Sequence, residues 1–442
     1  MTTGPVRDRA LLPRQVLIVM LLFGGYAACY FGRANFSVAM PLLADALRQR
    51  GVSADEAVVR LGEVYSLGVL AYAIGKMALG GLGDLWGGRR SFLLALGGAA
   101  LFTLLFSFGA GLPLFTVAWV GNRLTQSVGW AGLIKVTGRW FDFHTHGTVI
   151  GILSVSYLVG DALARQSMGA LLAHGATWVD LFRFAALVLG ALFILNLVLL
   201  RETRTELGFA PTTTNPVNLY AEEPPVAGRL TWAAWLRPLL LSRSFRLVCV
   251  LSFGCTVVRE AFNVWMPVFL KDSVGFDAAS AASLSAVFPA VGAVSVLLTG
   301  WAGDRLGVNG RPTLLFIGLV ATALVLIALY ALEPALIGRG ATVCLIGLVA
   351  FCLLGPYSYL GGAFALDFGG ARGGALASGL IDGVGYLGGT LAGAGVARIA
   401  VAFGWRGVFI GLACVATASA LAAGLMYLTQ RQTMRLSEGA SE

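Results

Sequence analysis

The sequence predicts an all-α membrane protein with twelve transmembrane helices, arranged as two pseudo-symmetric six-helix bundles. Three observations lead to this prediction: an apolar composition, apolar segments of spanning length along the whole chain, and two patterns that recur in the second half. Of the 442 residues, 57% are hydrophobic and only 12% are charged, whereas soluble domains carry about 25% charged residues. A water-soluble core of this size is therefore excluded.

Apolar segments follow one another along the chain, and each is close to the roughly 20 residues that a spanning helix needs. A long polar stretch containing TTTNP and EEPP separates two groups of them, which predicts an N-terminal bundle (1–200), a cytoplasmic linker (201–243), a C-terminal bundle (244–430) and a cytoplasmic tail (431–442). The expected spans are 15–43, 59–83, 90–110, 112–137, 147–171, 178–200, 244–270, 279–302, 312–332, 339–366, 373–402 and 405–428.

Arginine collects before the first span, in alternate connections and in the tail. Because positive residues favour the cytoplasmic side of a membrane, we expect both termini in the cytoplasm and a multi-pass protein surrounded by membrane lipid. The abundance of arginine over lysine, with much glycine and alanine, is typical of a GC-rich bacterial genome, so the expected location is a bacterial inner (plasma) membrane. The expected state is a monomer.

Two patterns recur at nearly the same spacing and indicate a duplication. Residues 33–41 (RANFSVAMP) match residues 259–267 (REAFNVWMP) at five of nine positions, with an offset of 226. A Gly-x-x-x-Asp-x-x-Gly pattern occurs at 80–87 and again at 300–307. The loops that carry it, GGLGDLWGGRR (80–90) and GWAGDRLGVNGR (300–311), resemble the cytoplasmic signature of the major facilitator superfamily. We expect a conformational latch from Asp84, Arg89, Asp304 and Arg305.

Charged residues inside apolar spans point to function, because a charge at the bilayer centre costs at least ~2.5 kcal/mol. The residues of this kind are Arg33, Lys76, Arg123, Lys135, Asp161, Arg165, Arg259, Glu260 and Asp382. Arg33 and Arg259 hold equivalent positions in the two repeats and should meet near the pseudo-twofold axis. Two guanidinium groups suit a phosphate or a carboxylate, so an anionic ligand is predicted. Alternatively, each arginine pairs with a neighbour such as Glu260 or snorkels.

Other chemistry has little support. The net charge of +9 belongs to loop arginines that set topology, so we expect no nucleic-acid partner. The six cysteines show no ligand spacing, and the three histidines fall in predicted loops. We therefore expect no metal, no cofactor and no enzymatic activity.

The chain is similar to the organophosphate:phosphate antiporters, which include glycerol-3-phosphate, hexose-phosphate and glucose-6-phosphate transporters. The resemblance rests on GGYAACYFGRANFSVAMPLL, AYAIGKMALGGLGD, SVGW, RETRTELGF, VVREAFNVWMPVFL, GPYSYLGG, GYLGG and FGWRGVF. It implies alternating-access transport of a sugar phosphate or glycerol phosphate in exchange for inorganic phosphate. It also implies that Arg33 and Arg259 clamp the phosphoryl group, while Tyr26, Tyr30, Lys76, Trp130 and Tyr386 line the cavity.

The chain departs from that family at four places: Ala34, Gly160-Asp161, Ala131-Gly132 and Phe364. Arg165 lies one helical turn after Asp161, and Tyr157 continues the same face, so these three residues are further candidates for the substrate-binding site. We expect an ion pair between Asp161 and Arg165; the alternative is that Asp161 faces the substrate. Two other functions stay open. One is proton-coupled carboxylate transport with Asp161 as the proton carrier, and the other is a membrane sensor of an organophosphate, for which the sequence shows no extra cytoplasmic domain.

Overall fold

The computed structural model describes residues 6–79, 86–142, 145–212, 239–306, 310–332, 334–361 and 363–439, and within these ranges it contains helices and no strands. The elements are α1 (Val6–Arg48), α2 (Ala54–Leu79), α4 (Gly88–Ser107), α5 (Leu112–Gln126), α6 (Gly129–Trp140), α7 (His146–Ala173), α8 (Trp178–Leu199), the 3-10 helix η2 (Arg204–Leu207), α10 (Arg243–Asp272), α11 (Ala278–Ser285), α12 (Val287–Arg305), α13 (Gly310–Ala331), α14 (Pro334–Ile337), α15 (Arg339–Tyr357), α16 (Ala363–Gly389) and α17 (Leu391–Gly439).

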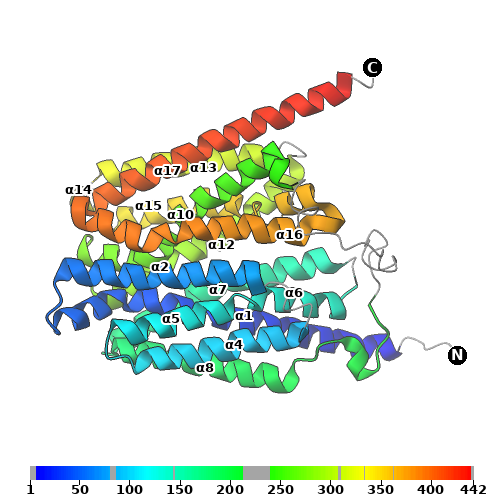
Figure 1. Ribbon diagram of the computed structural model, residues 1–442, viewed down its shortest axis with the longest axis horizontal. Helices are drawn as coiled ribbons and strands as arrows, with labels where there is room; N and C mark the ends of the chain where they lie inside the picture. Colours follow the sequence, from blue (N-terminus) through cyan, green and yellow to red (C-terminus); the bar gives the residue numbers. More distant parts are fainter. Residues whose placement is uncertain are drawn as a thin grey trace.

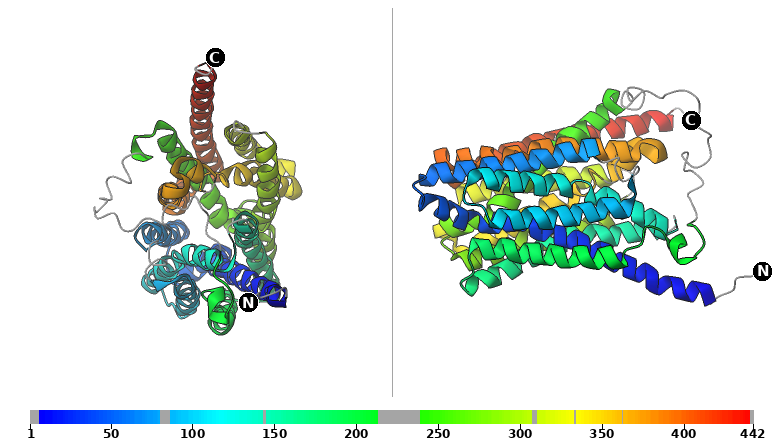
Figure 2. Two further views of the ribbon diagram at one scale, coloured as in Figure 1. Left: turned by 90° about the vertical axis from the view of Figure 1, so that its right-hand side faces the viewer. Right: turned by 60° about the horizontal axis from the view of Figure 1, so that its bottom comes forward.

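The helices run side by side along one axis (Figure 1). Helices α1 to α8 form one group and α10 to α17 form another, and the end-on view in Figure 2 shows the same grouping. The groups meet where α1, α2 and α7 contact α10, α11, α12, α16 and α17. Helix α1 begins and α17 ends at the same end of the bundle (Figure 1). We call the opposite end the distal end.

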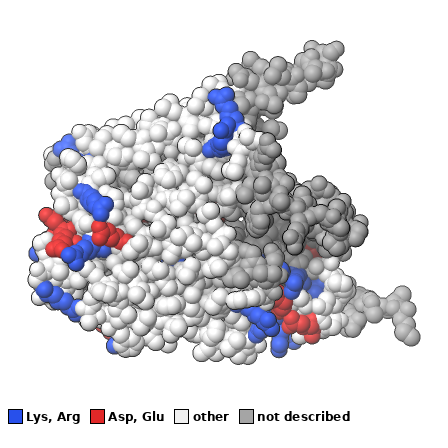
Figure 3. Space-filling view, viewed as in Figure 1, with Lys and Arg blue, Asp and Glu red and all other residues white. Residues whose placement is uncertain are grey.

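The surface of the bundle is apolar between its two ends. In Figure 3 the charged side chains gather near the two ends of the face shown, with a broad uncharged band between them. Large apolar side chains stand exposed on several of the helices, among them Leu101 at 62%, Leu187 at 70% and Leu324 at 62%. Exposed leucines in such numbers are tolerated when the surrounding medium is lipid rather than water.

Nine described helical stretches are long and apolar enough to cross a membrane. They cover ten of the twelve expected spans, because the stretch Ala377–Leu428 includes parts of the last two. The fourth expected span is divided into α5 and α6, and the fifth corresponds to α7. The helices therefore agree with the expected all-α fold class.

The expected boundaries near the C-terminus need correction. The expected span 373–402 is not one helix, because α16 ends at Gly389 and α17 begins at Leu391. The kink at Gly404 (φ 65°) does coincide with the expected break between the last two spans, and glycine adopts that conformation without a steric penalty. Helix α17 then continues to Gly439, so the segment expected to be a tail is helical over most of its length.

Candidate functional site

A small, partly enclosed cavity lies between the two groups of helices. Its volume of about 50 Å³ leaves room for only a few water molecules. The polar lining comes from α1, α2, α5, α7 and α10: Tyr30, Arg33, Ser37, Tyr65, Arg123, Tyr157, Asp161, Arg165, Arg259, Glu260 and Asn263. Arg33 and Arg259, which the sequence repeat relates, thus line the same cavity from the two halves of the chain.

Arg33 on α1 binds neutral partners. Its Nε donates to the Gln126 side-chain oxygen at 2.6 Å, and its two Nη atoms donate to the hydroxyls of Tyr30 and Tyr72, each at 3.1 Å. Its guanidinium carbon lies 4.6 Å from the centre of each of these two tyrosine rings. No carboxylate pairs with Arg33 among the described residues, so its charge is open to an anion.

Arg259 on α10 has a different environment. Its Nη2 donates to the Glu260 carboxylate at 2.6 Å and to the Tyr386 hydroxyl at 3.1 Å, while its buried Nε has no described partner. Glu260 also accepts the Tyr65 hydroxyl at 2.7 Å. The alternative in which an arginine pairs with Glu260 therefore holds for Arg259, whereas Arg33 remains unpaired with any described acid.

Two tyrosines join the halves beside the arginines. Tyr72 of α2 meets Tyr386 of α16 edge to face, with ring centres 4.8 Å apart. Lys76 lies 5.4 Å from both ring centres and binds Asp382 at 2.9 Å. Lys76 and Tyr386 therefore lie next to the cavity without lining it, and the charge of Lys76 is already matched by Asp382.

The remaining aromatic residues form a wall beside the cavity. The Tyr26 ring centre lies 5.1 Å from that of Trp130 and 6.0 Å from that of Tyr30. Tyr30 in turn lies 5.7 Å from Tyr157. Tyr30 and Tyr157 reach the lining, whereas Tyr26 and Trp130 stand behind them. The structure thus brings four of the five predicted aromatic residues together, whereas Tyr386 lies against Tyr72.

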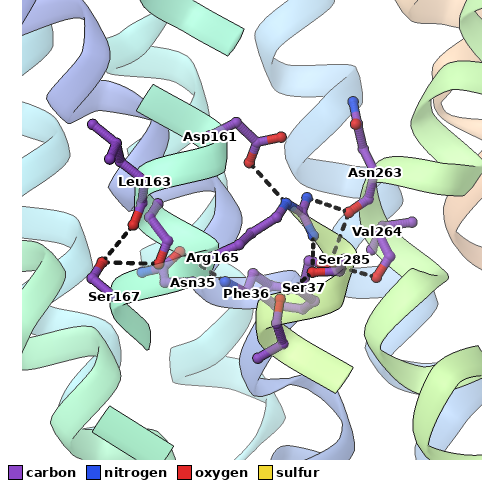
Figure 4. A network of polar contacts seen from close by, with 12 residues as sticks. Asn35, Phe36, Ser37, Asp161, Leu163, Arg165, Ser167, Asn263, Val264 and Ser285 are labelled. Carbon is purple, nitrogen blue, oxygen red and sulfur yellow. Dashed lines mark hydrogen bonds and ion pairs between the residues drawn. The ribbon is translucent and has the colours of Figure 1, made fainter. Parts of the chain in front are cut away.

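Asp161 and Arg165 form the expected ion pair on α7, with Nε 3.1 Å from the carboxylate oxygen and both side chains almost fully buried. Arg165 also crosses to the other half, where it donates to the Ser285 hydroxyl at 3.1 Å and to the Asn263 carbonyl oxygen at 2.7 Å (Figure 4). Gly160 lets α7 approach α1 closely, since an added Cβ would lie 2.4 Å from the Ala27 carbonyl oxygen.

The Asn263 carbonyl is available because of a proline one turn later in α10. In a regular helix this oxygen would accept the N–H of residue 267, but Pro267 has none. The Ser37 hydroxyl of α1 lies 2.8 Å from the Asn263 oxygen and 2.7 Å from that of Val264, and donates its one proton between them. Donors from α1 and α7 therefore converge on a carbonyl group that the proline has freed (Figure 4).

The distal end of the bundle is closed by further contacts between the halves. Lys271 binds Asp45 at 2.9 Å, and Arg398 binds Glu63 at 2.7 Å. Glycines allow the helices to touch there: added Cβ atoms at Gly62, Gly169 and Gly393 would lie 3.0 Å or less from backbone oxygens of the other half. The cavity is therefore shut off from the distal end in this conformation.

The expected latch is only partly described. Asp84 and the side chain of Asp304 lie outside the described part of the structure. Arg89 donates to the carbonyl oxygens of Leu197 and Leu200 at the end of α8, so its described side-chain contacts stay within its own half. Arg305 stacks over the Trp301 ring at 4.2 Å. The latch stays a prediction.

Sequence reasoning left some of the site unassigned. Arg123 was notable only as a charged residue within a span, although it lines the cavity. The same rule on buried charge could have placed it among the candidate site residues. Tyr72 and Gln126 carry no comparable signal in the sequence. Among the described residues, no group of three His, Cys, Asp or Glu side chains could hold a metal ion.

Comparison with known proteins agrees with this architecture. The family model described as "Major Facilitator Superfamily" matches residues 22–393. A probable hexose phosphate transport protein of Chlamydia pneumoniae is 26% identical and covers 95% of this chain and 92% of its own length. The glycerol-3-phosphate transporter of Bacillus subtilis is 24% identical, covering 91% and 90%. The membrane sensor protein UhpC of Escherichia coli is 25% identical, covering 91% and 90%.

Solved structures show the same fold. A D-xylose-proton symporter superimposes with a TM-score of 0.73 at 15% identity, covering 92% of this chain and 96% of that one. A bacterial homologue of the lysosomal transporter Spinster, described as inward-facing and unoccupied, gives a TM-score of 0.71 at 14% identity, covering 96% and 98%. The sequence resemblance to organophosphate transporters is thus confirmed at modest identity over nearly the full chain, and the protein belongs to the major facilitator superfamily of membrane transporters.

Proposed function

We propose that this transporter moves an organic phosphate, of the sugar phosphate or glycerol phosphate kind, in exchange for inorganic phosphate by alternating access. The observation that carries the proposal is that Arg33 and Arg259, from matching positions of the two repeats, line the same cavity. Relatives named for hexose phosphate and glycerol-3-phosphate transport support the choice of ligand.

The two arginines would act differently. Arg33 is held in place by Gln126 and two tyrosine hydroxyls, all neutral. A phosphoryl group that enters the site therefore meets an oriented guanidinium whose positive charge no described carboxylate neutralises. Arg259 first has to release or share Glu260, and Tyr65 can hold the carboxylate meanwhile. Phosphate binding would thus replace an internal ion pair at one arginine and create a new one at the other.

Exchange follows from the charge of the empty site. A buried guanidinium without a counter-charge is unfavourable in a low-dielectric interior, and closing the cavity around it keeps it from water. An anion that neutralises Arg33 lowers the free energy of the closed conformation. Return of the empty carrier is then slower than return with phosphate bound, which couples the two fluxes.

Two other functions have some support. Proton-coupled transport of a carboxylate would use Asp161 as the proton carrier, but Asp161 is bound to Arg165 in this structure, so it would have to give up that partner to carry a proton. A sensor function is suggested by the similarity to the membrane sensor protein UhpC. Transport measured with the purified protein in proteoliposomes distinguishes the two, because a carrier exchanges phosphate and a sensor alone does not.

The arrangement in the cell is part of the proposal. From the distribution of arginine we infer that both termini lie in the cytoplasm of a bacterium; in agreement, α1 begins and α17 ends at one end of the bundle (Figure 1). With that orientation the closed distal end faces outward. The protein would work as a monomer in the inner membrane.

The test is phosphate exchange in proteoliposomes that contain the purified protein and are loaded with inorganic phosphate. Arg33→Lys and Arg259→Lys should each reduce exchange by about 10- to 100-fold, because an ammonium group cannot reproduce the two-pronged geometry. The matched control is Arg60→Lys, since Arg60 lies half-exposed on α2 and pairs with Glu56. Exchange at the wild-type rate in both cavity variants would refute the clamp.

A further inference from the structure

Arg123 is the second arginine of the cavity that no described acid neutralises. It lies on α5, its side chain is buried at 3% exposure, and it lines the cavity. It forms no hydrogen bond or ion pair with any described residue, and its buried Nε has no partner. A buried guanidinium with free donors at a cavity wall is costly unless a ligand completes it.

Aromatic rings hold Arg123 in position. Its guanidinium carbon lies 4.7 Å from the centre of the Tyr72 ring and 5.7 Å from that of Trp119. Tyr72 also holds Arg33, at 4.6 Å. The two unpaired guanidinium groups therefore share one tyrosine. Cation–π contacts orient a guanidinium and offset part of its burial, but they leave its charge and its N–H donors available.

The charge of the cavity lining follows from its composition. Four arginines line it, and only two of them are matched by lining carboxylates: Arg165 by Asp161 and Arg259 by Glu260. Arg33 and Arg123 remain, so the lining carries a formal charge of +2. Lys76 and Asp382 lie outside the lining and neutralise each other.

We propose that Arg123 is a substrate-binding residue that acts together with Arg33 and makes the site selective for doubly charged anions over singly charged ones. This inference rests on the proposed function. A phosphate monoester carries nearly two negative charges at pH 7, which matches the +2 of the lining. A phosphate diester or a monocarboxylate carries one, and would leave one guanidinium buried without a counter-charge.

The test compares two ligands of similar shape and different charge. Glucose 6-phosphate and its methyl diester, with inorganic phosphate as a third probe, would be titrated into the purified protein at pH 7.5 by thermal shift and calorimetry. Wild type should prefer the monoester to the diester. Arg123→Gln should weaken the binding of the monoester by at least about tenfold and the binding of the diester much less. The reason is that loss of one nearby positive charge affects a dianion more than a monoanion.

Two further variants keep the result interpretable. Arg123→Lys retains the charge, and should keep most of the preference for the monoester even if both ligands bind more weakly. Arg60→Gln removes an exposed charge outside the cavity and should change neither affinity. A folding defect in Arg123→Gln would lower the fraction of protein that binds, which calorimetry reports as a lower stoichiometry, whereas the proposal requires the ratio of the two affinities in the folded fraction to fall.

The outcomes separate this inference from the function on which it rests. If wild type bound none of the three phosphate compounds, the proposed function and the selectivity for doubly charged phosphates would both be wrong. If wild type bound them, two results would refute the role of Arg123 alone. One is a preference for the monoester that rises in Arg123→Gln, and the other is a preference that is lost in Arg123→Lys. An unchanged ratio in Arg123→Gln would refute it equally.

Discussion

The bond network of Arg165 predicts that its loss is far more damaging than the loss of Asp161. Replacing Arg165 with glutamine leaves the Asp161 carboxylate buried without its cation, which costs about 3–5 kcal/mol, and removes the donor that crosses to the Asn263 carbonyl. Replacing Asp161 with asparagine keeps an oxygen near Nε, and Arg165 still binds Ser285 and Asn263. That change should cost only about 1–2 kcal/mol.

The double variant, Asp161→Asn with Arg165→Gln, removes the buried charge together with its partner. It should cost about 2 kcal/mol, chiefly from the lost bonds across the two halves. The sum of the single changes is larger, at about 4–7 kcal/mol, so the coupling between the two positions should be about 2–5 kcal/mol. Expression and exchange should fall in the order of these costs, and most in Arg165→Gln.

The measurement is reversible unfolding of the four proteins in mixed micelles, with phosphate exchange followed in parallel. The reasoning would be refuted if Arg165→Gln were no more destabilised than Asp161→Asn, or if the double variant were as unstable as the two singles combined. Exchange that depends on pH in wild type and not in Asp161→Asn would instead identify Asp161 as a proton-coupling residue.

Two other predictions concern the closure of the distal end and the orientation in the membrane. Pro267→Ala restores an N–H that can bond to the Asn263 carbonyl within α10, so the hydrogen bond from Arg165 to that carbonyl should weaken. Cysteine probes at the distal end should then react several-fold faster. The control is Pro41→Ala, the same change at the matching site of α1. Equal rates in wild type and Pro267→Ala would contradict the role of the freed carbonyl. Cysteines placed in residues 205–225 should be labelled only from the cytoplasmic side, and labelling from outside intact cells would invert the proposed orientation.

Much of the fold could be predicted because it depends on local patterns. Apolar length predicted the spans, and the repeat predicted that Arg33 and Arg259 face one cavity. The pair of Asp161 and Arg165 follows from spacing along a single helix. The break between α16 and α17 was missed because the apolar run continues through it, and the hydropathy of a segment does not register the geometry of its backbone.

The rest of the site depends on how distant segments meet. Arg259 and Glu260 are an exception, because they are adjacent and their pairing was an open alternative; helical spacing did not favour it, since consecutive residues on a helix do not face each other, yet the two side chains do pair. Lys76 and Asp382 meet only because α2 packs against α16. The partner of the Asn263 carbonyl could not be found from sequence either, since a proline shows which oxygen is free and not which donor will reach it.

The glycines at the distal end determine how the two halves can separate. Where α2 meets α17 and α7 meets α11, backbone oxygens of the other half lie close to Gly62, Gly169 and Gly393, and only the small side chains of Ser66 and Ser283 fit against Gly393 and Gly169. When surfaces of this kind separate, no large side chain has to leave a pocket in the facing helix. The rate of opening is then set by a few polar contacts and by the entry of water. A methyl group added at one of these glycines would keep the two helix surfaces from closing again.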